Sequence, residues 1–244
     1  MSQTQQSPLS PTTGEPVAVV ARRNRIGIWL CIVSDAGGTL ALLIAYSYLW
    51  SLNVNNAWAP PNNAFADPLP FWLITLGAII GVLLLWWGVA GLAKGKRGQA
   101  IGAAALSLVV YVITFIGQIV QLSTFPFDIS DGAYASATFW LCIAAALHLS
   151  LMVTLVLGVA GRTRAGLIST ANPSHARLVA MYGTWVAIAI FLGALFATTM
   201  TTSPNTGSPP MGDFQQPSPA ASASAGAAGS APSAATPAAS PSAG

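Results

Sequence analysis

Two ionisable side chains interrupt apolar segments of this sequence and could handle protons there. Asp35 lies within the stretch 26–50, and His148 lies within the stretch 135–161. A charged side chain at the centre of a bilayer costs about 2.5–3.5 kcal/mol on insertion scales, so Asp35 should face protein or water rather than lipid. Desolvation at that depth favours the neutral acid. Two interpretations of Asp35 remain open: a proton-active or channel-tuning carboxyl, and an acid that hydrogen-bonds a neighbouring helix.

His148 could ligate haem, relay a proton or hydrogen-bond between helices. The other histidine, His175, lies in a polar loop beside Arg177, so the chain cannot supply a histidine pair to a haem within the membrane. Cys31 and Cys142 lie in apolar runs and lack the CxxC spacing of zinc sites, which favours two buried free thiols. No Walker A motif, nucleophile elbow or HExxH motif is present. We therefore expect no metal site and no catalytic residue in this chain.

Two glutamines form a further polar feature. Gln118 and Gln121 lie one helical turn apart near the end of the apolar stretch 101–122, where they would share a helical face. Their amides either hydrogen-bond across helices or simply approach the membrane interface.

The composition indicates which kind of fold holds these side chains. Charged residues make up 6% of the chain and hydrophobic residues 54%, with a mean hydropathy of +0.64. A soluble domain has about 25% charged residues, so a soluble enzyme is excluded and an all-α membrane protein is predicted. The net charge of +3 does not indicate a nucleic-acid partner. Five apolar stretches are each long enough to cross a bilayer: 26–50, 71–93, 101–122, 135–161 and 178–200.

The cations show a strict alternation between the loops. All 9 Lys and Arg residues fall before the first span or in every second loop: Arg22, Arg23, Arg25, Lys94, Lys96, Arg97, Arg162, Arg164 and Arg177. The intervening loops carry only the acids Asp67, Asp128 and Asp131. The positive-inside rule therefore predicts a cytoplasmic amino terminus and an external carboxyl terminus.

Both ends of the chain have the composition of disordered tails. Residues 1–21 are polar and predict a disordered cytoplasmic tail, while 22–201 hold the spans. Residues 202–244 are rich in Pro, Ala and Ser and predict a disordered extracytoplasmic tail, either a spacer or unselected low complexity. No internal repeat is visible, and an odd number of spans disfavours a transporter built from equal halves.

Four short motifs occur in an order that resembles that of a known protein family. Residues 25–35 read RIGIWLCIVSD, residues 115–121 read FIGQIVQ, residues 131–136 read DGAYAS, and residues 182–186 read YGTWV. Together with His148, they resemble the subunit III family of haem–copper oxidases, in a divergent version of its short five-helix bacterial form. The resemblance covers about residues 22–200.

The resemblance assigns roles residue by residue. Asp35 stands where the family has a buried glutamate, and Gln118, Tyr134, His148 and Tyr182 match family positions. Other family residues are lost, because a glutamate, two histidines and an aspartate fall on Gln121, Ala145, Thr184 and Ala187. The departures weaken the roles that depend on those positions.

The resemblance implies a non-catalytic subunit of a respiratory complex in a bacterial plasma membrane. That complex reduces dioxygen with electrons from cytochrome c or quinol and pumps protons. Subunit III binds no cofactor, since haem and copper belong to partner subunits. Its partners would be subunit I, subunit II, a small subunit IV and membrane phospholipids. Asp35 would be the buried carboxyl, with these structural or lipid-contacting residues: His148, Tyr182, Gln118, Gln121, Tyr134, Arg25 and Arg162.

Other functions remain open from the sequence alone. A subunit-III-like accessory protein of a nitric oxide reductase would carry the same topology, and the lost motif residues favour it. A small transporter or channel would explain Asp35, and a membrane scaffold would use the carboxyl-terminal tail to bind an outside partner.

Overall fold

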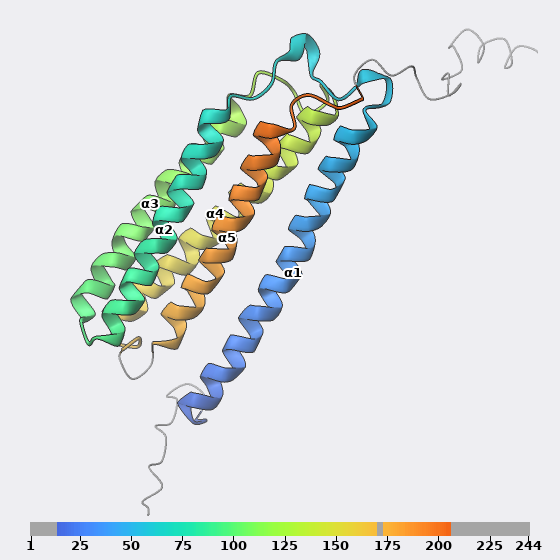
Figure 1. Ribbon diagram of the computed structural model, residues 1–244. Helices are drawn as coiled ribbons and strands as arrows, with labels where there is room; N and C mark the ends of the chain where they lie inside the picture. Colours follow the sequence, from blue (N-terminus) through green and yellow to red (C-terminus); the bar gives the residue numbers. More distant parts are fainter. Residues whose placement is uncertain (1–13, 170–172, 206–244) are drawn as a thin grey trace, which may run out of the picture. The chain divides into compact units, whose positions relative to one another are not determined.

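The computed structural model describes residues 14–169 and 173–205, which form five long helices (Figure 1). Their bounds are α1 Val17–Leu52, α2 Pro68–Ala93, α3 Arg97–Ser123, α4 Ala133–Arg164 and α5 Ser174–Thr199, with 3-10 turns at Val54–Asn56 and Pro61–Asn63. Each of the five helices is long and apolar enough to cross a membrane. The predicted all-α class with five membrane-spanning helices is confirmed.

The helix ends are determined by local sequence. The side chain of Asp67 accepts a hydrogen bond from the backbone N–H of Leu69, and Pro68 takes the first position of α2, where a missing N–H costs nothing. Between α2 and α3 the chain reverses through Gly95 at φ 72°, a conformation that glycine adopts without strain. Consecutive spans therefore run in opposite directions.

The first helix is longer than predicted. It begins at Val17, directly after Pro16, nine residues before the predicted start of the first span, so residues 17–21 are helical. Hydrophobicity marks only the part of a helix that meets lipid, and nothing in 17–25 breaks a helix. Residues 1–13 lie outside the described part of the chain.

The start of the predicted external tail is also ordered by contacts. Ser203 donates a hydrogen bond to the carbonyl of Trp50 at 2.7 Å, and the Trp50 indole donates to the carbonyl of Thr202 at 2.8 Å. Residues 202–205 are thus attached to the end of α1, and the remaining tail residues, 206–244, lie outside the described part of the chain.

Helices α2, α3, α4 and α5 form the core, and α1 packs at its side against α4 and α5 (Figure 1). In the most apolar window of α1 only 11% of the residues are buried, compared with 50% in α5. Large apolar side chains of α1, such as Leu30 and Ile44, are exposed on its outer face, as lipid-facing residues are. Because apolar packing is sparse, polar contacts have a larger part in positioning α1.

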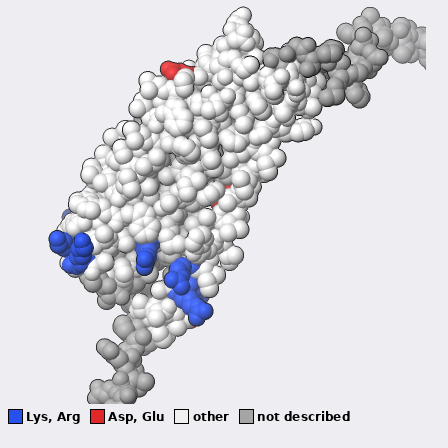
Figure 2. All heavy atoms as spheres, viewed as in Figure 1, with Lys and Arg blue, Asp and Glu red and all other residues white. Residues whose placement is uncertain are grey.

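The cations gather at one end of the described residues (Figure 2). The antiparallel topology brings the start of α1, the α2–α3 loop and the α4–α5 connection to that end. Arg97 caps the carboxyl-terminal end of α4, since its guanidinium donates to the carbonyls of Thr163 at 3.3 Å and Arg164 at 2.7 Å. The clustering agrees with the predicted alternation, and its cytoplasmic location stays a prediction.

Candidate functional site

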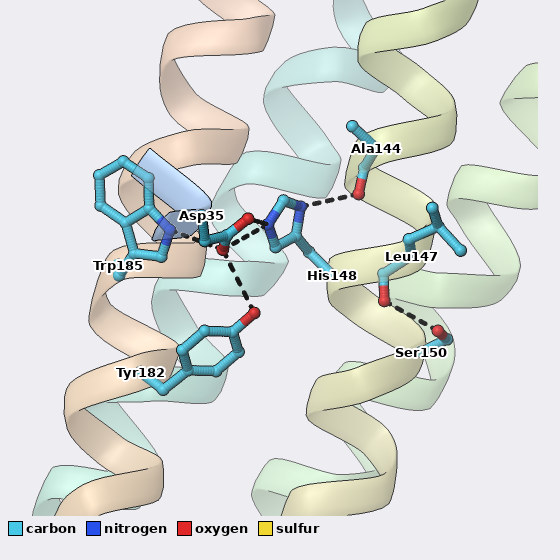
Figure 3. Close-up of polar contacts among 7 residues, drawn as sticks. All are labelled: Asp35, Ala144, Leu147, His148, Ser150, Tyr182 and Trp185. Carbon is cyan, nitrogen blue, oxygen red and sulfur yellow. Dashed lines mark hydrogen bonds and ion pairs between the residues drawn. The ribbon is translucent and has the colours of Figure 1, made fainter. Parts of the chain in front are cut away.

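The carboxylate of Asp35 is the centre of a polar cluster between α1, α4 and α5 (Figure 3). Its Oδ2 lies 2.8 Å from Nε2 of His148 on α4, and its Oδ1 lies 3.0 Å from the same nitrogen. From α5, the Trp185 indole N–H donates to Oδ2 at 2.8 Å and the Tyr182 hydroxyl donates at 3.3 Å. The acid does hydrogen-bond neighbouring helices, which was one of the two interpretations drawn from the sequence.

The tautomer of His148 is fixed by its second nitrogen. Nδ1 lies 2.7 Å from the carbonyl oxygen of Ala144, which can only accept, so Nδ1 carries a hydrogen. Nε2 then either accepts a proton from a neutral Asp35 or donates one to an ionised Asp35. The contact between Nε2 and the carboxyl group therefore requires one hydrogen between them.

Donors from α5 complete the cluster around the acid. The N–H of Trp185 and the O–H of Tyr182 both point at Oδ2, so this oxygen is contacted from α4 and α5 together. The arrangement lets a proton pass between Asp35 and His148 with little movement of the side chains.

The pair is reachable from one side of the protein. A cleft of about 380 Å³ is lined by Asp35, Gly38, Thr39, Leu42, Ala144, Leu147, His148, Leu151 and Tyr182. The side chain of Asp35 is 26% exposed and that of His148 is 12% exposed. The remaining lining residues are mostly apolar. The cleft therefore lies at the depth of the apolar part of the helices, and Asp35 and His148 form its polar side.

Trp185 is the member of the cluster that the sequence did not reveal. Its indole N–H points at Asp35 within the bundle. The available signal was its spacing, since Trp185 comes three residues after Tyr182 and therefore lies on the same face of α5.

The two glutamines pair with each other rather than with Asp35. Gln118 donates from Nε2 to Oε1 of Gln121 at 3.2 Å, so they share a helical face as predicted. Gln118 is 2% exposed and Gln121 is 4% exposed, so both amides are buried within the bundle near the end of α3. No described residue partners Nε2 of Gln121.

Other predicted residues lie apart from the cluster. Tyr134 is fully buried, donates to the carbonyl of Ala197 at 3.1 Å and packs edge-to-face on Trp58. Arg25 and Arg162 are exposed at the cationic end, where a lipid headgroup could reach them. Cys142 is buried as expected, whereas Cys31 is exposed because it lies on a side of α1 that no other helix covers.

Within residues 14–169 and 173–205, no three His, Cys, Asp or Glu side chains gather closely enough to hold a metal ion.

Comparison with known proteins agrees with the motifs. No protein-family model matches the chain. The chain is similar to the cytochrome c oxidase subunit 3 of Cyanidium caldarium, with 30% identity over 131 residues, which is 52% of this chain. That stretch covers 48% of the relative, so the chain matches about half the length of the curated protein. The predicted resemblance is confirmed at this level: the chain is a distant, divergent relative of cytochrome c oxidase subunit 3 and a multi-pass membrane protein.

Proposed function

We propose that this chain is the non-catalytic subunit III of a bacterial haem–copper oxidase, in the plasma membrane with its amino terminus in the cytoplasm. The observation that carries the proposal is the similarity to cytochrome c oxidase subunit 3. In this role the chain binds no cofactor, and haem and copper belong to its partners. Subunit I is the main partner, together with subunit II and a small subunit IV.

The geometry around Asp35 gives this role a chemical basis. The acid and His148 lie 2.8 Å apart at positions where the motifs resemble those of subunit III. A hydrogen-bonded acid and histidine, bordered by a cleft at lipid depth, suit a subunit that supports proton uptake by its neighbour and contacts lipid. The exposed guanidiniums of Arg25 and Arg162 suit anionic headgroups at the cytoplasmic surface.

Purification with partners tests the proposal directly. The full-length chain, tagged at one terminus and extracted in a mild detergent, should bring with it a subunit that has the absorption spectrum of haem and consumes oxygen with a reduced donor. The untagged strain, treated in the same way, is the control. A chain that migrates alone and without haem contradicts the proposal.

The same preparation separates the alternative from the main proposal. A co-purified core that reduces nitric oxide instead of oxygen would identify the chain as the accessory protein of a nitric oxide reductase. This outcome would leave the membrane topology intact and change only the partner.

A further inference from the structure

A second, smaller space lies on the inner side of the Asp35–His148 pair. It is a cavity of about 40 Å³ to which all five helices contribute, and its polar lining residues are Thr39, Gln118, Cys142 and His148. A cavity needs about 10–15 Å³ of such space for one water molecule, so there is room for more than one. Thr39, Leu42, Ala144 and His148 line both the cavity and the cleft, so the two spaces adjoin.

The hydroxyl of Thr39 has an unmet hydrogen-bonding capacity. Threonines inside these helices commonly return their hydroxyl to the carbonyl four residues earlier, as Thr75, Thr114 and Thr184 do. Among the residues that the structure describes, Thr39 makes no such bond and no other side-chain hydrogen bond. A hydroxyl at lipid depth is stabilised by a partner, and the cavity beside it is the place for one.

The amides of Gln118 and Gln121 lie on the far wall and directly behind it. Gln118 lines the cavity, donates to Gln121, and contacts the thiol of Cys142 with its side chain. Behind it, Nε2 of Gln121 is buried without a partner among the described residues. A water needs two to four polar partners, and the hydroxyl of Thr39, the amide of Gln118 and the thiol of Cys142 can supply them.

We propose that this cavity is a binding site for water, which bridges Thr39 and Gln118. Beyond the water, the polar contacts continue from Gln118 to Gln121. Both glutamines lie in the last two turns of α3, at the end that carries the acidic loops. This inference does not depend on the oxidase role.

Radiolytic labelling of sulfur side chains tests the site in the full-length protein in lipid nanodiscs. Hydroxyl radicals produced by X-rays from bound water oxidise side chains that touch that water. Cys142 lines the cavity and is 3% exposed, whereas Met152 is fully buried and lies outside the cavity lining. We expect Cys142 to be oxidised several-fold faster than Met152. Equal, slow oxidation of both would mean a dry cavity and would overturn the proposal.

Oxidation of Cys142 in single-residue variants then identifies the groups that bind the water. In Thr39→Val the oxidation of Cys142 should fall about fivefold, the change expected when one hydrogen bond of about 1 kcal/mol is lost. Gln118→Leu should have at least this effect, and Met152 should be unchanged in both. Thr114→Val is the matched control, because Thr114 bonds its own helix and does not line the cavity. Unchanged oxidation of Cys142 in Thr39→Val and Gln118→Leu would overturn the bridging role, and the wild-type comparison stands even if a variant fails to fold.

Discussion

His148 joins Asp35 to the backbone of α4 through its two ring nitrogens. Nε2 lies 2.8 Å from Oδ2 of Asp35, and Nδ1 lies 2.7 Å from the carbonyl oxygen of Ala144. Since the carbonyl fixes one hydrogen on Nδ1, the protonation of His148 and that of Asp35 are alternatives for the same proton. This relationship attaches α1, the least buried of the described helices, to α4 through a single pair.

Asp35→Asn should separate the proton-holding role of the acid from its structural role. The amide oxygen still accepts from Trp185 and Tyr182, so the attachment of α1 and the melting temperature should change little. The amide cannot take up a proton at this depth, so in an oxidase complex electron transfer should persist while proton uptake or turnover stability changes. Oxygen consumption and proton release, measured on the same preparation, check this.

Asp35→Ala provides the comparison, because it removes the acceptor as well. Interhelical hydrogen bonds in membranes contribute about 0.6 kcal/mol each, up to about 1.7, so unfolding should become easier by about 1–2 kcal/mol. If Asp35→Asn leaves both proton uptake and turnover stability at wild-type values, the acid is a packing residue. Ser34→Ala, one position earlier on an exposed side of α1, is the control for substitution in this helix.

Trp185→Phe should shift the proton of the pair toward Asp35. The indole N–H donates to Oδ2 at 2.8 Å and so stabilises the carboxylate, and phenylalanine keeps the ring while losing the donor. The infrared band of a protonated carboxyl should therefore increase, and it should disappear in the Trp185→Phe protein that also carries Asp35→Asn.

Trp86→Phe is the matched control for this measurement. The indole of Trp86 also donates to α5, but to the hydroxyl of Thr184 at 3.0 Å and not to Asp35. It should leave the carboxyl band unchanged. An equal change in both variants would show that the band reports general loosening of α5 rather than the loss of a donor to Asp35.

The sequence predicts the helices well and their ends less well, for a physical reason. Spans are set by the length of apolar sequence that a bilayer requires, whereas ends are set by capping residues and by the turn residues beyond them. Thus α2 was placed to within a few residues, while the start of α1 at Val17 was missed because the polar residues 22–25 separate the short apolar run 17–21 from the long apolar stretch. Those polar residues continue the helix without a break.

The candidate site could be predicted only in part. An acid and a histidine at lipid depth are conspicuous, because each would be unstable without a partner. That they are partners of each other depends on the rotation and depth of α1 and α4, which no local pattern determines. Trp185 was missed because an indole is compatible equally with an interface, a core and a hydrogen bond to an acid.

Gly81→Ala should destabilise the core of the bundle. A Cβ at Gly81 would lie 2.8 Å from the ring of Tyr111, which is fully buried and cannot move aside. Overpacking of this kind costs about 1–3 kcal/mol. Thermal unfolding of the purified protein should show the loss. In contrast, Gly102→Ala on α3 meets no atom within 4 Å and should be neutral or slightly stabilising. Equal stability of the two variants would contradict the close contact of α2 with α3.

The location of the cationic end can be tested by labelling single cysteines from outside the cell. With Cys31 and Cys142 replaced by alanine, a cysteine at Asn63 in the α1–α2 connection should react with a membrane-impermeant maleimide in intact cells. A cysteine at Gly98, at the start of α3 beside Lys96, should react only after the membrane is opened. These results are expected if the cations face the cytoplasm, because translocating them across the membrane is unfavourable. The reverse pattern would invert the topology.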